Sequence, residues 1–411
     1  MSLDSLSFPE SWKVVPIPDV VFFQEGPGVR KHQYTDSGVK LLNGGNINDN
    51  NLNLSSTDRY VSEEEAYGKY SHFLVEEGDL LIACSGVVVD KFDGKIAYAR
   101  KKDLPLCMNT STMRFRSLDK EILSLDYFKY FLQTRLFKSQ LQKLITGSAQ
   151  LNFGPSHIKQ MVIPLPPLPE QKRIAAILDK ADAIRRKRQQ AIQLADDFLR
   201  AAFLDMFGDP VTNPKGWDEA VLKDIADIRS GVTKGKKIDP SIAVTLPYMR
   251  VANVQDGFLS LDDVQEITVS PKDAEKCKLM DGDILLTEGG DPDKLGRGHV
   301  WNDEVPNCIH QNHIFSVRIK DLNIIRPEFL SAQIASQRGK RYFLKVGKQT
   351  TGIATINKTV LSEFEPFVPP VEIQDKYIRI ASFIKKLKAN SPIDNMGIFE
   401  SLSQKAFLGE L

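Results

Sequence analysis

The chain of 411 residues is 42% hydrophobic, which is enough apolar material for two or three packed domains. Its formal net charge of +1 excludes a global basic field, so any contact with DNA must come from local patches. The four scattered cysteines form no CxxC pair, the first residues lack a signal-peptide pattern, and no apolar run reaches the ~18 residues of a membrane span. We therefore expect a cytoplasmic protein without a structural metal or a disulfide framework.

The first predicted element is a mixed α/β domain over residues 1–165. A basic, glycine-containing loop, GPGVRKH at 26–32, follows Trp12. A Gly-Asp turn then leads into an apolar strand in VEEGDLLIACSG at 75–86. A proline-rich exit, IPLPPLPEQ at 163–171, keeps the end of the domain extended.

A long helix is predicted next, within residues 166–210. From Glu170 to Phe207 there is no Pro or Gly, and apolar residues recur at spacings of three and four, as on one face of a helix. At ~1.5 Å per residue, this helix is roughly 55 Å long. The natural partner for its apolar face is the chain after residue 369, in an antiparallel, coiled-coil-like pair that would space two domains apart. The alternative is a helix that packs on one domain only.

Residues 211–368 repeat the first domain. Trp217 lies 205 residues after Trp12, and the landmarks that follow keep their order: GVTKGKK at 231–237, LMDGDILLTEGG at 279–290 and FVPPVEIQ at 367–374. Shared order at a near-constant offset indicates an internal duplication. The sequence therefore predicts an α+β fold with two copies of one mixed α/β domain.

The remaining residues, 369–411, form a helical region in this interpretation. Pro392 interrupts the apolar pattern, and proline costs ~3 kcal/mol inside a helix. We therefore expect two shorter helices, at about 371–389 and 395–408, in place of a second unbroken rod.

The motifs of a DNA enzyme are missing from the sequence. An adenine methyltransferase needs a glycine-rich cofactor loop and an Asn/Asp-Pro-Pro-aromatic segment, and a translocating ATPase needs GxxxxGK[ST]; none of these three patterns occurs. Glu288, Asp291 and Asp293 superficially resemble the carboxylates of a metal-dependent nuclease. The first repeat, however, has Cys84 and two valines in the matching stretch. We expect a chain that catalyses no reaction itself.

Matched loops in the two repeats carry residues suited to DNA. Side chains that donate and accept hydrogen bonds can read base edges, while Lys and Arg neutralise phosphates. The candidates in the first repeat are Arg30, Lys31, Asn43, Asn46, Ser85, Lys91, Lys95, Gln150 and Asn152. Those in the second repeat are Lys236, Lys237, Arg250, Asn253, Glu288, Lys294, Arg297, Lys348, Thr350 and Thr351. Each loop taken singly could be an ordinary surface turn, but their coincidence in both repeats favours DNA binding.

A family resemblance covers nearly the whole chain. The segment IKQMVIPLPPLPEQKRIAAILDKADAIRRKRQQAI and the final SLSQKAFLGEL resemble the specificity subunits of type I restriction–modification systems. The resemblance implies that each repeat is a target-recognition domain for one half of a split double-stranded DNA target, and that the helices fix the gap between the halves.

The resemblance also implies partners. Two adenine-N6 methyltransferase subunits and two restriction (translocase–nuclease) subunits would dock on the helices and use S-adenosylmethionine, ATP and Mg, while this chain binds no cofactor. Two other functions remain open from the residues alone. One is a self-contained restriction or modification enzyme with diverged motifs, and the other is a helical scaffold that binds only proteins.

Overall fold

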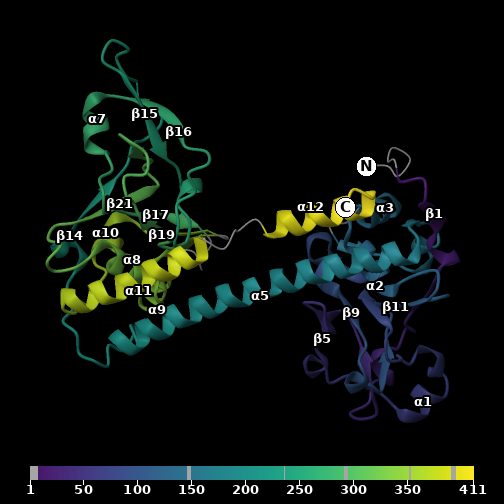
Figure 1. Ribbon diagram of the computed structural model, residues 1–411. Helices are drawn as coiled ribbons and strands as arrows, with labels where there is room; N and C mark the ends of the chain where they lie inside the picture. The colour runs from purple at the N-terminus through teal and green to yellow at the C-terminus, as the bar shows by residue number, and fades with distance from the viewer. Residues whose placement is uncertain (1–7, 146–149, 236, 291–294, 351–352, 390–394) are drawn as a thin grey trace. The chain divides into compact units, whose positions relative to one another are not determined.

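The computed structural model describes residues 8–145, 150–235, 237–290, 295–350, 353–389 and 395–411 (Figure 1). The chain divides into two compact units. Unit 1 comprises Met1–Gln189 together with Pro392–Leu411, and unit 2 comprises Gln190–Ser391. Each unit contains both sheets and helices, so the α+β fold expected from the sequence is confirmed.

Unit 1 is built around an antiparallel sheet with the strand order β2-β11-β7-β9, beside a smaller sheet with the order β10-β3-β6. All four side chains of β7 are buried, which explains why this strand reads as a continuous apolar run. The strands of unit 1 are β1 (Lys13–Pro16), β2 (Val21–Glu25), β3 (Val39–Leu42), β4 (Ile47–Asn48), β5 (Asn51–Leu52), β6 (Tyr60–Val61), β7 (Leu80–Ala83), β8 (Ser85–Val88), β9 (Ile96–Tyr98), β10 (Leu106–Met108), β11 (Thr112–Ser117), β12 (Gln150–Asn152) and β13 (Val162–Leu165). Its short helices are α1 (Glu63–Tyr67), α2 (Leu125–Gln133), α3 (Arg135–Leu144) and α4 (Pro155–Ile158).

Unit 2 repeats this topology. Its four-stranded sheet has the order β14-β21-β17-β19, and its smaller sheet has the order β16-β15-β20, in which β15 and β20 are parallel as β3 and β10 are in unit 1. The strands are β14 (Ala226–Ser230), β15 (Val244–Met249), β16 (Gln265–Val269), β17 (Ile284–Thr287), β18 (Gly289–Gly290), β19 (Gly298–Val300), β20 (Ile309–His310), β21 (Ile314–Ile319), β22 (Lys348–Thr350) and β23 (Ile353–Thr355). The short helices are α6 (Leu222–Ile225), α7 (Pro271–Lys276), α8 (Pro327–Ala335), α9 (Gln337–Val346) and α10 (Lys358–Ser362).

The long helix α5 (Leu168–Phe207) has 40 residues and contributes to both units. In unit 1 its first part pairs with α12 (Asn395–Leu408): the Arg185 guanidinium lies 5.2 Å from the Phe399 ring centroid, and Arg173 Nη2 donates to the Leu411 carbonyl at 3.0 Å. As residue numbers fall along α5 they rise along the tail, so the two helices run antiparallel.

The second part of α5 pairs with α11 (Val371–Ala389) inside unit 2. Lys388 and Asp196 form an ion pair at 2.7 Å, and the rings of Tyr377 and Phe203 lie 5.4 Å apart. This pair is also antiparallel. Within each unit, therefore, the expected pairing of the tail with the long helix is confirmed (Figure 1).

A buried glutamine fastens the start of α5 to unit 1. The side chain of Gln171 is completely buried. Its Oε1 accepts the backbone N–H of Ser124 at 2.9 Å, and its Nε2 donates to the carbonyls of Ile122 and Pro166, both at 2.8 Å. One side chain thus satisfies three backbone groups from the loop before α2 and from the proline-rich exit.

Gln374 makes the same three bonds at the start of α11. It too is completely buried; its Oε1 accepts the Arg326 N–H at 2.9 Å, and its Nε2 donates to Ile324 and Pro369 at 3.0 and 2.7 Å. Each unit therefore holds its helix by the same device. This detail supports the internal duplication independently of the sheet topology.

A buried histidine makes the stability of unit 2 depend on pH. His310, fully buried at the end of β20, donates from Nδ1 to the Cys277 carbonyl at 3.0 Å, while its Nε2 has no hydrogen-bond partner among the described residues. Burial lowers the pKa of His310 to about 4, although the Cys277 carbonyl opposes the shift. The unfolded chain takes up this proton near pH ~6.5, so the neutral ring stabilises the fold fully above that pH and progressively less as the pH falls toward 4.

We expect the free energy of unfolding of unit 2 to fall by about 2 kcal/mol between pH 7 and pH ~4.5 through His310 alone. Denaturant titrations of the wild type and of His310→Gln at both pH values measure this difference. The variant should be less stable at pH 7 and should show a correspondingly smaller pH dependence. Equal pH dependence in the two proteins would contradict the assignment.

Candidate nucleic-acid interface

Two of the predicted loops meet a further turn at Cys84 in unit 1. The Cys84 N–H donates to the Ser111 carbonyl, and the Cys84 carbonyl accepts the Phe153 N–H, each at 3.0 Å. The strand that follows, β8, then pairs antiparallel with β12. The loop after β7, the turn before β11 and the β12 segment therefore join at one residue.

Unit 2 contains the same arrangement at Glu288. The Glu288 N–H donates to the His313 carbonyl at 3.0 Å, and the Glu288 carbonyl accepts the Ile356 N–H at 2.8 Å. Here β18 pairs with β23, and β23 with β22. We call these two sites, Cys84/Ser111/Phe153 and Glu288/His313/Ile356, the loop junctions.

An ion pair with a buried carboxylate lies at the other end of the strand that leads to each junction. In unit 1 the Arg116 guanidinium binds both carboxylate oxygens of Asp79, and in unit 2 Arg318 binds Asp283 through Nε and Nη2, both at 2.7 Å. The carboxylates are almost completely buried, in the Gly-Asp turns that precede β7 and β17. The pairs fix these turns to β11 and β21.

The basic loops start at glycines that the fold requires. A Cβ at Gly26 would lie 2.5 Å from the Asn109 carbonyl oxygen, and one at Gly231 would lie 2.0 Å from that of His310. Only glycine permits this approach of two backbones. The exposed Arg30 and Lys31 follow the first glycine, and the exposed Lys237 follows the second.

Two of the predicted base-reading residues hold their own turns instead. Asn46 and Asn253 are each only 3% exposed. The Oδ1 of each accepts the backbone N–H three residues earlier at 2.9 Å, and each Nδ2 donates to a carbonyl of the following loop, Asn53 or Ser260. Their polar atoms are occupied inside the protein, so neither side chain is available to contact a base.

Several other candidates lie at the surface but already have a partner. Asn43 Oδ1 accepts from Asn109 at 3.1 Å, and Arg250 Nη2 donates to Asp263 at 2.6 Å. Lys95 Nζ donates to Asn48 at 2.6 Å, which ties two of the predicted loops together. DNA would have to compete with these bonds or use the outward atoms of the same groups.

The remaining predicted DNA-contact residues differ in how exposed they are, and some of them lie outside the described residues. Asn152 is exposed, and its Oδ1 accepts from the Ser85 hydroxyl at 2.9 Å and from the Gly86 N–H at 2.8 Å. Lys91 is exposed, whereas Arg297 is half-buried. The predicted residues or side chains outside the described part of the structure are Gln150, Lys236, Lys294, Lys348, Thr350 and Thr351.

The two junctions differ in charge. Burial, with a smaller effect of Glu25, raises the pKa of the Cys84 thiol to about 12, so unit 1 has a neutral side chain at this position. Unit 2 has the Glu288 carboxylate there, hydrogen-bonded to His313, a residue that the sequence interpretation did not include in the site. The backbone frame is thus shared, while the chemistry it presents is not.

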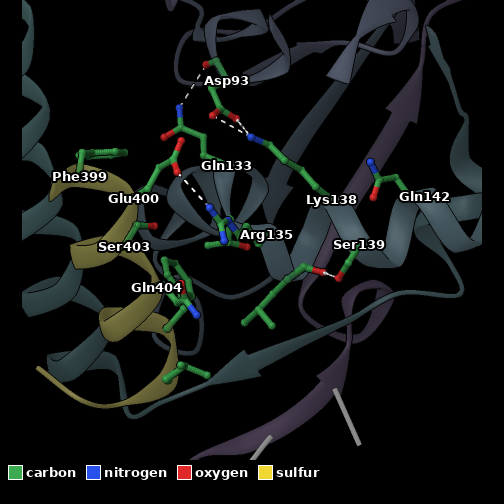
Figure 2. Close-up of a pocket in the computed structure, with 14 residues that line it drawn as sticks. Asp93, Gln133, Arg135, Lys138, Ser139, Gln142, Phe399, Glu400, Ser403 and Gln404 are labelled. Carbon is green, nitrogen blue, oxygen red and sulfur yellow. Dashed lines mark hydrogen bonds and ion pairs between the residues drawn. The ribbon is translucent and has the colours of Figure 1, made fainter. Parts of the chain in front are cut away.

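A groove of about 580 Å³ lies elsewhere in unit 1, between α3 and α12 (Figure 2). Arg135 of α3 pairs with Glu400 of α12 across it at 3.3 Å, and Lys138 pairs with Asp93 at 2.7 Å. These charged groups bind each other, so the groove marks where α12 packs against the rest of unit 1. None of the three junction residues lines it.

Neither a metal centre nor a membrane helix is found in the described residues. They contain no group of three or more His, Cys, Asp or Glu side chains that could hold a metal ion. Of the nuclease-like carboxylates, Asp291 and Asp293 lie outside the described residues. Within those same ranges, no helix is long and apolar enough to cross a membrane.

The fold and the junctions define a tandem-repeat protein, in which one α/β domain with one set of loops occurs twice and the long helix α5 contributes to both copies. The chain belongs to the type I restriction modification DNA specificity domain family, whose model matches residues 9–194 and again residues 214–402. The resemblance to specificity subunits is therefore confirmed, once for each unit.

Individual relatives agree with this assignment. The chain is 25% identical to the type I restriction enzyme StySPI specificity subunit of Salmonella potsdam and 23% identical to the EcoKI specificity subunit of Escherichia coli (strain K12). Each alignment, gaps included, is 430 positions long and covers 98% of this chain and 90% of the relative. The crystal structure of the type I restriction-modification system S subunit from M. genitalium is similar with a TM-score of 0.57 at 15% identity, covering 100% of this chain and 97% of that one. At that identity the likeness shows a shared fold.

Proposed function

We propose that this chain is the non-catalytic, DNA-reading subunit of a cytoplasmic type I restriction–modification complex, and that each unit reads one half of a split target. The observation that carries the proposal is the loop junction that occurs twice with the same backbone bonds and different side chains. Two domains that bind different half-sites need a shared backbone frame with different side chains, because the backbone positions the loops while the side chains select the bases.

Phosphate contacts would come from the exposed cations on the loops. Arg30, Lys31 and Lys91 in unit 1 and Lys237 in unit 2 are exposed, and no ion pair with a described residue engages them. Local clusters of this kind allow DNA binding in a chain whose net charge is only +1. Binding through them weakens as the salt concentration rises.

Docking of partner subunits would use the helices. In unit 2, Leu194 and Phe198 on α5 and Phe383 on α11 are 68%, 56% and 62% exposed. Large apolar side chains on one helix pair favour a protein partner that covers them. We assign this role to two adenine-N6 methyltransferase subunits and two restriction subunits, which would supply the S-adenosylmethionine, ATP and Mg chemistry that this chain lacks.

Exchanging a unit tests the proposal. Replacing residues 1–160 with the matching segment of a relative should change one half of the methylated sequence and leave the other half unchanged, because each unit has its own junction. Methylation-aware sequencing of DNA from cells that express the hybrid with its methyltransferase subunit provides the measurement. The reciprocal exchange of residues 211–368 is the matched control and should change the other half. Coupled changes in both halves would refute the two-reader proposal.

A further inference from the structure

The loop junction of unit 2 carries an exposed side-chain pair that unit 1 does not have. His313 Nδ1 lies 2.7 Å from Glu288 Oε2, with the imidazole 57% and the carboxylate 32% exposed. The matching residues of unit 1 are Cys84, which is buried, and Ser111, whose hydroxyl accepts the Gly44 N–H at 2.9 Å. None of the three junction residues of unit 1 therefore has a charged side chain, and the nearby carboxyl group, that of Glu25, comes from β2.

The pair is not needed to hold the junction together. Both units form the same two backbone bonds at this point, with lengths between 2.8 and 3.0 Å. Unit 1 achieves this with cysteine and serine. Comparison of the two units thus shows that the fold requires the two backbone bonds but does not require the Glu288–His313 pair.

A carboxylate is an unusual group for a surface that faces a polyanion. It is repelled by phosphates, so it favours binding only where it accepts a hydrogen bond from a donor on the DNA. In the major groove the available donors are the exocyclic amino groups, cytosine N4 and adenine N6. The two glycines after Glu288 form β18 and have no side chains that would keep a base edge away.

The geometry leaves Glu288 ready for such a donor. A carboxylate oxygen can only accept, so His313 donates its Nδ1 hydrogen to Oε2 and fixes the orientation of the carboxylate. Oε1 forms no hydrogen bond to any described residue. One oxygen is thus held by the protein, and the other remains available.

We propose that Glu288 accepts a hydrogen bond from the exocyclic amino group of a base in the half-site read by unit 2, and that His313 is its positioning residue. This inference rests on the proposed function, because it needs unit 2 to contact base edges. It goes further by giving one base of the target a chemical class, cytosine or adenine, and by assigning the residues that select it.

The test uses the full chain in complex with its methyltransferase subunit and a DNA library randomised over the target. Glu288→Ala should reduce discrimination about ten- to hundred-fold at one base pair of one half-site. Glu288→Gln keeps the shape but adds a donor, so it should alter the preference at that same base pair. His313→Ala should weaken discrimination there and nowhere else, which a purely structural role would not do.

Glu275→Ala is the matched control, since Glu275 is an exposed carboxylate on α7 of the same unit; it should leave every preference unchanged. Thermal unfolding of each variant identifies any loss of fold, and the near-isosteric Glu288→Gln keeps the test valid if Glu288→Ala unfolds. Unchanged preferences, or an even loss of affinity on all sequences, in a folded Glu288 variant would overturn the inference while leaving the proposed function intact. A wild-type complex without any sequence preference would overturn both.

Discussion

Replacing Gln374 with leucine should lower the free energy of unfolding of unit 2 by about 3–5 kcal/mol. Leucine fills a similar volume but removes the partner of the Arg326 N–H and of the Ile324 and Pro369 carbonyls, which lie in buried or partly buried hydrogen bonds. Each unpaired buried group costs about 1–3 kcal/mol, partly offset by the apolar side chain. Denaturant titration measures the loss, and hydrogen exchange should locate it at the start of α11.

Gln171→Leu should have the same effect in unit 1, because Gln171 makes the same three bonds there. Gln190→Leu is the matched control: it changes an exposed glutamine on α5 and should alter stability by less than ~0.5 kcal/mol. A loss below about 1 kcal/mol in both buried variants would mean that the surrounding loops rearrange to satisfy their backbone groups without the glutamine.

Inserting four residues after Gln189, with four more after Ser391 so that the tail can follow, should lengthen the unread gap of the DNA target by one or two base pairs. Gln189 is exposed and lies where the two units divide on α5, so the insertion spares the buried contacts of both. Four residues add ~6 Å and about one turn of helix, and one base pair rises ~3.4 Å. Neither half-site should change, which methylation-aware sequencing can determine.

A two-residue insertion at the same place serves as the comparison. It rotates the second part of α5, and unit 2 with it, by roughly 200°, so both units should stay folded but methylation of the split target should be lost. If the four-residue variant folds and methylates DNA with the original gap, the helix does not set the spacing, and the methyltransferase subunits must do so.

The sequence by itself determined the features that depend on local signals. The absence of Pro and Gly between Glu170 and Phe207 predicted a helix that the structure places at Leu168–Phe207. Pro392 predicted the break in the tail, and the two helices span Val371–Ala389 and Asn395–Leu408. The duplication was also readable, because equivalent turns and strands recur in one order. Periodicity and helix breakers are properties of neighbouring residues, and repeated order is read by comparing two stretches of the sequence, so none of these signals requires a structure.

Only the tertiary structure decided which polar residues support the fold and which face outward. Asn46 and Asn253 had the chemistry of base-reading residues, but both are buried in their own turns. Gln171 and Gln374 look in the sequence like ordinary polar residues of a helix start, yet each is completely buried and binds three backbone groups. The final helix α12 belongs to unit 1, and Glu288 meets His313 only where β18 and β21 begin. Burial and hydrogen bonding depend on residues that are distant in the chain, and no local pattern encodes which of those residues will meet.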